Sequence, residues 1–364
     1  MSPTCVDWNR AITRVLAGGQ PALVAQPIVG LASGDVVGFE LLARFTGPPV
    51  ATPDVWFAEA DRQGLGPQLT ARVLTSALAL RDTLPPNTFL TVNVEPHLVT
   101  DPRVRDVLHG SGRLDRVVLE LTEHAVAPDV KELSAALDRV RGDGGLIAMD
   151  DAGTGYAGLG QLLAIRPDFV KLDRELVSGV DGDPIMRALV EMLGELAGRM
   201  DAWLLAEGVE TVGEVQALAA LGVPLAQGWQ FARPGPIWPA LDRAARDVLA
   251  GLVVTGDAGD NIAHLVRACP SATAREECGP GAVLVDEHRR PLAVGYLDAE
   301  GAARLGPAMA VAAASSVTEV ARRAMARPVW CRGLPVVCTD PRGETIGLVD
   351  VADLVEESTG TADS

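Results

Sequence analysis

Polar residues that can bind cations close most of the apolar runs in the first two thirds of the sequence. Seven of eight such runs end in or near a carboxylate, an amide or a lysine: Glu40, Asn93, Glu120, Asp150 with Asp151, Lys171, Glu207 and Gln227. If these side chains converge, their carboxylates repel one another unless cations lie between them. The pattern therefore predicts a metal site.

The ligand types indicate which metal and which chemistry. All the candidate ligands are hard oxygens, with no cysteine or histidine at these run ends. Such a set suits Mg²⁺ or Mn²⁺ rather than zinc or copper. The adjacent Asp150 and Asp151 can point to two sides, so that one of them bridges two ions. Two ions about 3.5–4 Å apart stabilise the attacking and departing oxygens of phosphodiester hydrolysis together.

Lys171 is the unusual member of the set. Only Lys131 and Lys171 are lysines among the 31 basic residues of the chain. Lys171 follows the apolar pair Phe169-Val170, and burying an ammonium costs several kcal/mol unless it is paired. A compact ammonium can approach a reacting water or a phosphate oxygen where a planar guanidinium does not fit. We therefore expect Lys171 to pair with the metal-binding carboxylates and to serve catalysis.

The elements that must position these residues are strands alternating with helices. Between about residues 20 and 235, eight apolar runs, from "ALVAQPIVGL" to "LAQGWQF", alternate with amphipathic segments. This order predicts an α/β fold of the (β/α)8 TIM-like barrel type, whose active site lies at the carboxyl ends of the strands. Only "ASGD" separates the first two runs, so we expect the first strand to be antiparallel. A doubly wound open sheet is the alternative.

Composition bounds the class of partner. The chain has 364 residues, 48% of them hydrophobic, and a formal net charge of −17. This balance argues against duplex DNA, although metal ions would permit a small phosphate ligand. We find no signal peptide and no apolar stretch near the roughly 20 residues of a membrane span. The five cysteines form no CxxC pair and favour reduced thiols. We expect a soluble, cytoplasmic protein.

Eight short motifs, in order, resemble those of the EAL-domain phosphodiesterases, barrel enzymes that linearise cyclic di-GMP to pGpG with two divalent cations. The resemblance covers about residues 20–240. The motifs are "QPIV" at 26–29, "ELLAR" at 40–44, "VNVEP" at 92–96, "ELTE" at 120–123, "DDAGTGY" at 150–156, "VKLD" at 170–173, "AEGVE" at 206–210 and "QGWQFARP" at 227–234. Each motif alone is weak, whereas eight in the right order are specific.

The resemblance implies a role for each matching position. Metal ligands are expected at Glu40, Asn93, Glu120, Asp150, Asp151 and Glu207, with Asp150 as the bridge. The expected catalytic residues are Lys171, which would hold the hydrolytic water, Glu207 and Glu40. Contacts with the dinucleotide or its rim are expected from Gln26, Leu42, Arg44, Glu210, Gln227 and Pro234. Glu123 matches the acid that braces the "DDAGTGY" loop, which joins a homodimer interface in the family.

Three departures from the family pattern bear on activity. Leu41 and Ala152 replace the motif alanine and the loop phenylalanine, and Glu95 stands where a small hydroxyl is expected. Leu41 should point away from the site if Glu40 points into it, because strand side chains alternate. Trp229, where the family often has tyrosine, either packs in the barrel or offers a stacking surface for guanine.

The histidines form no predicted site. His97, His109 and His124 share no coordination spacing, so we expect surface or cap roles for them.

The last third of the chain has another pattern. The segments "GAVLVDEHRRPLAVGYLD" at 281–298 and "LPVVCTDPRGETIGLVD" at 334–350 repeat with a period of about 52 residues, and each follows a predicted helix. They resemble a CBS pair, a regulatory module that commonly binds adenine nucleotides. Asp353 matches a ribose-binding position of that family, whereas Asp350 replaces its hydroxyl. A dimerisation or scaffolding role is the alternative.

These patterns divide the chain into four parts. We expect an N-terminal helical segment at 1–19, the barrel at 20–248, the CBS-pair-like regulatory domain at 249–356 and a disordered tail at 357–364. An active phosphodiesterase is the leading functional hypothesis. A weak or inactive cyclic di-GMP receptor, or a scaffold regulated through the C-terminal domain, is the alternative.

Overall fold

The protein is described from a computed structural model. The structure describes residues 7–18, 20–31, 34–86, 88–122, 130–150, 156–200, 202–255, 261–298, 301–313, 315–325, 327, 331–340 and 343–360. It divides into two compact units. The first contains residues 1–29, 35–165 and 227–247, and the second contains residues 30–34, 166–226 and 248–364. The expected domain boundary near residue 248 stays a prediction.

Eight strands form a closed barrel in the order of the chain. They are β1 (Ala22–Gly30), β2 (Val36–Arg44), β3 (Phe89–Val94), β4 (Val117–Leu121), β5 (Leu146–Met149), β6 (Phe169–Leu172), β7 (Trp203–Ala206) and β8 (Leu225–Ala226). β1 pairs antiparallel with β2, while β2 to β5 pair in parallel, as do β6 to β8. The predicted barrel and its antiparallel first strand are confirmed, and the open sheet was wrong.

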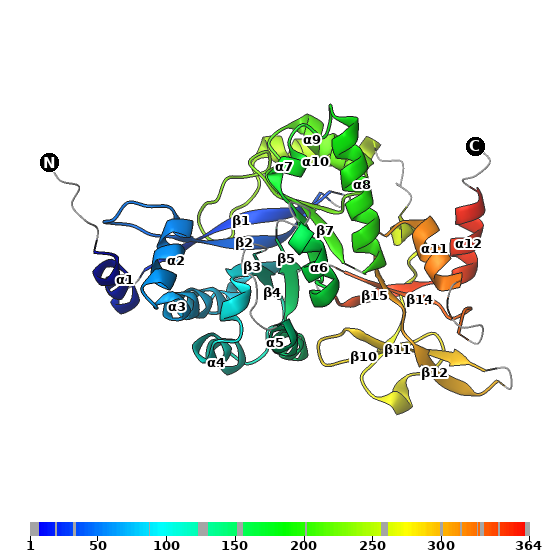
Figure 1. Cartoon of the computed structure of the whole chain (residues 1–364). Helices are drawn as coiled ribbons and strands as arrows, with labels where there is room; N and C mark the ends of the chain where they lie inside the picture. Colours follow the sequence, from blue (N-terminus) through cyan, green and yellow to red (C-terminus); the bar gives the residue numbers. More distant parts are fainter. Residues whose placement is uncertain are drawn as a thin grey trace. The chain divides into compact units, whose positions relative to one another are not determined.

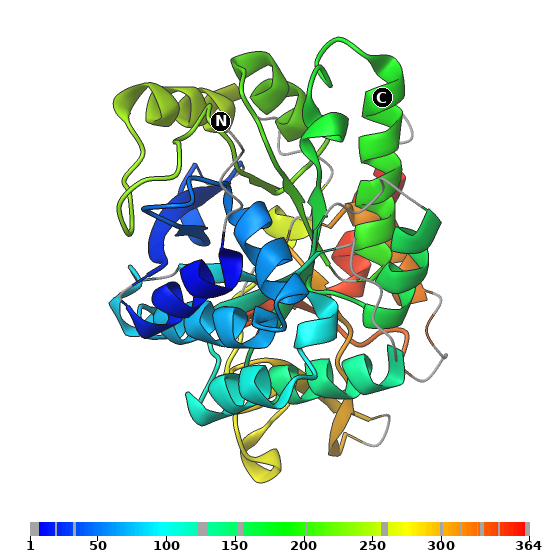
Figure 2. The ribbon, with the colours of Figure 1, turned by 60° about the vertical axis from the view of Figure 1, so that its left-hand side comes forward.

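In the first unit, helices cover a set of largely buried strands, of which β4 and β5 are buried along their whole length, as in parallel sheets with both faces covered. The helices are α1 (Trp8–Ala17), α2 (Pro53–Arg62), α3 (Gly66–Leu78), α4 (Pro102–Gly110), α5 (Val130–Gly142) and α6 (Tyr156–Ile165), with short 3₁₀ turns η1 (Arg81–Thr83) and η2 (Pro96–Leu98). In Figures 1 and 2, α1, α2 and α3 lie side by side. Leu74 of α3, Leu119 of β4 and Leu137 of α5 belong to one buried cluster that joins helices α3 to α6 to the strands.

In the second unit, β6 is followed by α7 (Arg174–Val177) and α8 (Pro184–Arg199), and β7 is followed by α9 (Val212–Ala220). Local signals start these helices. The side chain of Asp183 caps α8 ahead of Pro184, and Thr211 with Glu214 forms a capping box on α9, which satisfies backbone donors that a helix start leaves unpaired. Helix α10 (Arg243–Thr255) follows the barrel.

The C-terminal residues form two small sheets. One has the order β12-β11-β10-β9, from β9 (Ser271–Ala272), β10 (Val283–Val285), β11 (Pro291–Leu297) and β12 (Ala303–Pro307). The other has the order β13-β14-β15, from β13 (Ala310–Ala312), β14 (Val336–Thr339) and β15 (Thr345–Val349). Helices α11 (Val317–Met325) and α12 (Val351–Gly360) lie side by side in Figure 1.

The two sequence repeats in the C-terminal residues share the role of their glycines but differ in secondary structure. A β-carbon at Gly295 would lie 2.0 Å from the carbonyl oxygen of Gly279, and one at Gly347 would lie 2.4 Å from that of Arg267. Both repeat glycines therefore let another backbone segment pass. The second half has the order strand, helix, two strands, helix. In the first half a 3₁₀ turn, η3 (Ile262–Leu265), replaces the predicted helix, and β12 stands where the second half has α12.

Two further expectations concern the chain end and the thiols. Helix α12 continues to Gly360, within the segment expected as a disordered tail, and residues 361–364 lie outside the described residues. The expected tail stays a prediction. Cys269, Cys278 and Cys338 are free thiols, which agrees with the expected reduced state. Burial raises the pKa of the Cys338 thiol to about 12, so this thiol is unreactive.

No helix among the described residues is long and apolar enough to cross a membrane.

Gly38 tests the packing between β2 and β3. A β-carbon at this position would lie 2.5 Å from the ring of Phe89, its partner in the sheet register. We expect Gly38→Ala to lower the free energy of unfolding by about 1–3 kcal/mol through overpacking. Gly110→Ala at the end of α4, where no atom lies within 4 Å, is the control and should be neutral or stabilising. Equal denaturant midpoints for the two variants would contradict this packing.

Candidate active site

The first unit holds Glu40 in a nearly buried network of amides. The Glu40 side chain lies on β2, with the residue 8% exposed. The Nδ2 amide of Asn93 on β3 donates to its Oε1 at 3.1 Å, and the Nε2 amide of Gln227 donates to its Oε2. Each carboxylate oxygen of Glu40 therefore accepts a hydrogen bond from a neutral side chain. Such bonds orient the carboxylate without neutralising its charge.

The network continues to β1. Gln227 Nε2 also donates to Gln26 Oε1 at 3.1 Å, and Gln26 Nε2 donates to the carbonyl oxygen of Ala232 at 3.0 Å. Gln26 stands opposite Glu40 in the β1–β2 register. Gln26, Glu40, Asn93 and Gln227 were each expected in the site, and the structure brings them together.

Glu120 and Asp150 provide two further carboxylates in the same unit. Glu120 is fully buried on β4 and stands next to Asn93 in the β3–β4 register. Asp150 directly follows β5, and its N–H donates to the carbonyl oxygen of Leu121 at 2.9 Å. A carboxylate oxygen of Glu120 and one of Asp150 lie within 4.8 Å of each other. Asp151 and Glu123 lie outside the described residues.

The second unit contains the buried lysine. Lys171 lies on β6 and is 1% exposed. Its Nζ forms an ion pair with Oε1 of Glu207, which follows β7 and donates its N–H to the carbonyl oxygen of Leu172 at 3.0 Å. The acidic partner expected for Lys171 is thus present. The pairing offsets part of the cost of burying the ammonium.

Other residues expected to touch substrate lie at the edges of these groups. Arg44 Nη1 donates to the carbonyl oxygen of Ala43 at 2.9 Å, and Leu42 and Pro234 are partly buried. Glu210 forms an ion pair with Arg174 of α7, with 2.7 Å between Oε2 and Nη2. The Glu210 carboxylate is therefore paired with a guanidinium of the second unit. The roles expected for Leu42, Arg44, Glu210 and Pro234 stay predictions.

The structure shows the surroundings of the departure Leu41 and of Trp229. Leu41 is 2% exposed and belongs to the buried cluster that contains Leu74 of α3, which confirms that it points away from Glu40. Trp229 is 50% exposed, so it does not pack fully into the barrel. The Arg233 guanidinium stacks on its ring, with Cζ 3.8 Å from the centroid. Sequence reasoning missed Arg233, for which the spacing of four residues from Trp229 was the available signal.

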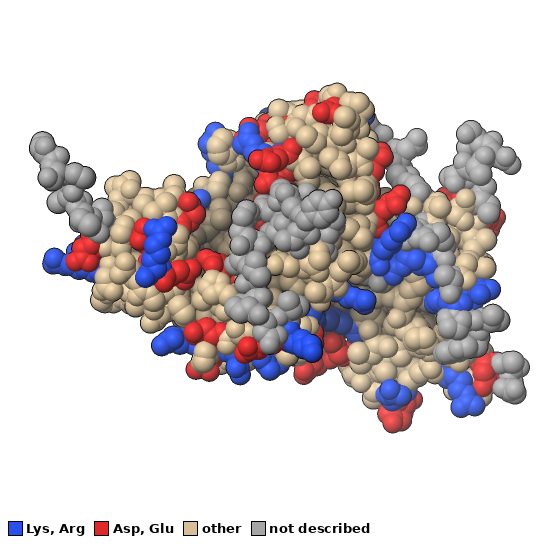
Figure 3. Space-filling view, viewed as in Figure 1, with Lys and Arg blue, Asp and Glu red and all other residues tan. Residues whose placement is uncertain are grey.

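The donor chemistry fits divalent cations. Glu40, Glu120 and Asp150 offer carboxylate oxygens, and Asn93 offers an amide oxygen. Hard oxygen donors of this kind are what Mg²⁺ and Mn²⁺ require. This group of oxygen donors can therefore hold metal. On the face drawn in Figure 3, acidic and basic side chains are interspersed rather than gathered in one basic patch.

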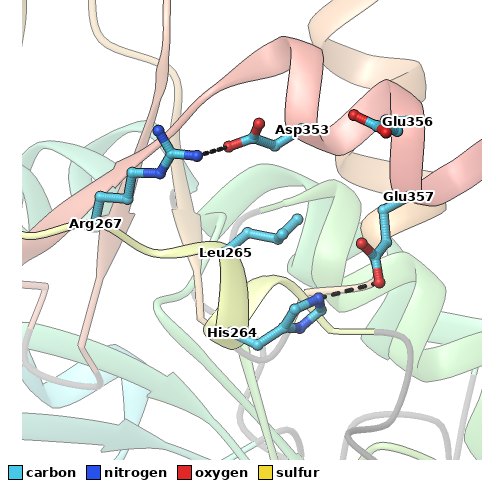
Figure 4. A pocket seen from close by; sticks show the side chains of 6 residues that line it. All are labelled: His264, Leu265, Arg267, Asp353, Glu356 and Glu357. Atoms are coloured by element: carbon cyan, nitrogen blue, oxygen red, sulfur yellow. Dashed lines mark hydrogen bonds and ion pairs between the residues drawn. The ribbon is translucent and has the colours of Figure 1, made fainter.

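A second, separate hollow lies in the C-terminal residues of the second unit. It is lined by His264, Leu265, Arg267, Asp353, Glu356 and Glu357. Figure 4 shows Arg267 reaching Asp353, at 2.6 Å, and His264 reaching Glu357, at 3.3 Å. Asp353, the expected ribose contact, is thus paired with a guanidinium. A nucleotide there stays a prediction.

Comparison with known proteins places the fold and these residues in a family. The sequence profile of the family described as "EAL domain" matches residues 9–234. The chain belongs to the EAL domain family.

Relatives with curated sequences cover the same region. The "Probable cyclic di-GMP phosphodiesterase PdeB" of Escherichia coli (strain K12) is 32% identical over 221 residues, which is 58% of this chain and 42% of the relative. The "Uncharacterized protein Rv1357c" of Mycobacterium tuberculosis (strain ATCC 25618 / H37Rv) is 32% identical over 235 residues, 60% of this chain and 76% of the relative. The match thus spans less than half the length of PdeB.

Solved structures share the fold. The "PaMucR Phosphodiesterase, c-di-GMP complex" is 27% identical with a TM-score of 0.56, and the match covers 64% of this chain and 98% of that one. The "Klebsiella pneumoniae BlrP1 pH 9.0 manganese/cy-diGMP complex" is 31% identical with a TM-score of 0.53, over 60% of this chain and 57% of that one.

The amide network around Glu40 can be tested through stability. Gln227→Leu removes a donor from a nearly buried carboxylate oxygen, so we expect it to lower the free energy of unfolding by about 1–3 kcal/mol. Gln63→Leu, at an exposed position after α2, is the control and should change it by less than about 0.5 kcal/mol. Chemical denaturation without divalent ions measures both. A Gln227→Leu variant as stable as the control would show that the network does not hold Glu40.

Proposed function

We propose that this chain hydrolyses cyclic di-GMP to linear pGpG with the help of two Mg²⁺ or Mn²⁺ ions. The observation that carries the proposal is the group of Glu40, Asn93, Glu120 and Asp150 in a barrel of the EAL domain family. Glu40 and Glu120 are buried, and the other two are half-buried. Buried carboxylates without a compensating cation are costly, so the group is suited to hold metal. Solved relatives in complex with cyclic di-GMP support the choice of substrate.

The two groups of residues act together in this proposal. The carboxyl ends of parallel barrel strands meet at one face. Lys171 on β6 and Glu207 after β7 would therefore join the carboxylates of β2, β4 and the residue after β5, which are Glu40, Glu120 and Asp150. Asp150 would bridge the ions, and Asp151 and Glu207 would complete the ligand set.

The chain's own residues would bind and orient the reactants. The ions would neutralise charge on the phosphate and help to deprotonate water. Lys171 would hold the attacking water through its ammonium, and Glu207 would fix the position of Lys171. Water adds to phosphorus, the bond from phosphorus to the 3′ oxygen breaks, and a 5′-phosphate and a 3′-hydroxyl result. Substrate would be held by Gln26, Leu42, Arg44, Glu210, Gln227 and Pro234.

A cyclic di-GMP receptor with little or no turnover is the second candidate. It is favoured by Glu95, an acid where a small hydroxyl is expected two residues after Asn93. An extra carboxylate there could divert a cation from the catalytic group. Homodimer formation through the loop at 150–156 and regulation through the C-terminal residues belong to both candidates as further proposals.

Binding and turnover measured together on the whole chain separate the candidates. We expect conversion of cyclic di-GMP to pGpG in Mg²⁺ or Mn²⁺, its loss in a chelator and its loss in Glu40→Ala. Binding without pGpG formation in any of these ions would support the receptor. Neither binding nor turnover would leave the barrel a scaffold and overturn the proposal.

Lys171 distinguishes a catalytic ammonium from a structural counter-ion. We expect Lys171→Arg to lose kcat almost as severely as Lys171→Ala, because a guanidinium is larger and planar. An interaction that strengthens in the transition state contributes little to substrate binding, so affinity measured in Ca²⁺ should survive both substitutions. An active, stable arginine variant together with an unstable alanine variant would leave Lys171 a purely structural residue.

Trp229 should affect binding rather than chemistry. Its half-exposed ring, with Arg233 on one side, can stack a guanine base, and such stacking contributes about 1–3 kcal/mol. We therefore expect Trp229→Ala to raise the dissociation constant of cyclic di-GMP by about 5- to 100-fold, with kcat changed little. Trp229→Tyr keeps a ring and is the matched control. Equal affinities of the alanine variant and the wild type would exclude the stacking role.

A further inference from the structure

Three potential metal ligands meet in the first unit beside, but outside, the group around Glu40. Asp61 lies in the last turn of α2, Glu95 follows β3, and His97 lies in η2. A carboxylate oxygen of Asp61, one of Glu95 and a ring nitrogen of His97 all lie within 4.8 Å of one another. His97 Nδ1 is 3.3 Å from Glu95 Oε2. Spacing among the histidines predicted only a surface or cap role for His97, because it did not consider carboxylates and because Asp61 comes from a distant segment.

The backbone holds these three side chains in place. The Oδ1 atom of Asp61 lies 1.7 Å from the position that a β-carbon on Gly66 would take, so the carboxylate occupies room that only glycine leaves. The N–H of Leu98 donates to the carbonyl oxygen of Glu95 at 2.9 Å, and the hydroxyl of Thr100 donates to that of His97 at 3.3 Å. The donor positions are therefore set by local structure and not by long mobile side chains alone.

The charges of the three groups favour an added cation. A carboxylate oxygen of Asp61 lies within 4.8 Å of one of Glu95, and a single imidazole, that of His97, accompanies the two carboxylates. A divalent ion would relieve their repulsion.

The donor set differs in kind from the catalytic group. The group around Glu40 offers only oxygens, whereas this one offers an imidazole nitrogen and two carboxylates. Imidazole suits zinc, copper and nickel, while all-oxygen sets suit magnesium and manganese. Zn²⁺ sites with three protein ligands leave a fourth position for water.

We propose that Asp61, Glu95 and His97 form a site for one first-row transition ion of the Zn²⁺ class, distinct from the ions of the proposed hydrolysis. We call it the His97 site. It goes beyond the proposed function, because the residues that would bind cyclic di-GMP and its two ions do not include these three. Glu95 is only two residues from Asn93, so the ion would lie close to the end of β3 that carries this amide.

His109 provides a matched control. Its Nδ1 lies 2.6 Å from Asp143 Oδ2, in the same unit. This pair offers one imidazole and one carboxylate. Among the described residues, no third potential ligand lies close enough to complete a group of three with them. Two donors hold a transition ion less tightly than three.

The test uses the whole chain with excess Mg²⁺, which fills the all-oxygen sites, and one equivalent of Cu²⁺ as a probe. We expect pulsed EPR to show ¹⁴N coupling from one imidazole. The coupling should vanish in His97→Gln and persist in His109→Gln and in Asp150→Asn. Coupling that survives His97→Gln, that disappears in His109→Gln, or that is absent from the wild type overturns the proposal.

Zn²⁺ titration of the same proteins gives an independent readout. We expect Glu95→Ser, which restores a small hydroxyl, and His97→Gln each to raise the Zn²⁺ dissociation constant at least about tenfold. His109→Gln should leave it unchanged. Circular dichroism and thermal melting show whether each variant is folded. Folded Glu95→Ser and His97→Gln variants with wild-type Zn²⁺ affinity would also overturn the site. Neither readout depends on turnover, so failure of the proposed hydrolysis would not affect them.

Discussion

Burial of charge inside the barrel is the constraint on which the rest of this structure depends. Glu40, Glu120 and Lys171 are all at most 8% exposed, and a buried charge without a partner costs several kcal/mol. Different interactions offset this cost in the two units. Lys171 pairs with Glu207, whereas Glu40 accepts hydrogen bonds from Asn93 and Gln227. Neutral amides leave the negative charge of Glu40 available to a cation.

Much of this arrangement could be predicted from the sequence, because it follows from local periodicity. Short apolar runs alternating with helices indicated the barrel, and the brief connection "ASGD" indicated the antiparallel first strand. Strand alternation predicted that Leu41 would point away from the site if Glu40 points into it. A lysine in an apolar run required an acidic partner, and Glu207 is such a partner.

What the sequence could not show depends on contacts between distant segments. The bond from Gln227 to Glu40 spans 187 positions, and no local pattern specifies which amide meets which carboxylate. The meeting of Asp61 with Glu95 and His97 likewise requires the end of α2 to approach the end of β3. In the C-terminal residues, Gly295 and Gly347 hold equivalent places in the repeat, and each lets another backbone segment pass close by. The helix predicted before the first repeat, however, is only the 3₁₀ turn η3 (Ile262–Leu265). Tertiary packing, rather than the repeated sequence, determines the secondary structure of residues 262–265.

The central claim is that the barrel carboxylates hold two divalent ions at one site. The most direct measurement is the EPR spectrum of the whole chain saturated with Mn²⁺. Two ions about 3.5–4 Å apart should give an exchange-coupled signal that disappears in Glu40→Ala. A spectrum of magnetically isolated Mn²⁺ alone, from protein that hydrolyses cyclic di-GMP at full rate in the same buffer, would contradict the account.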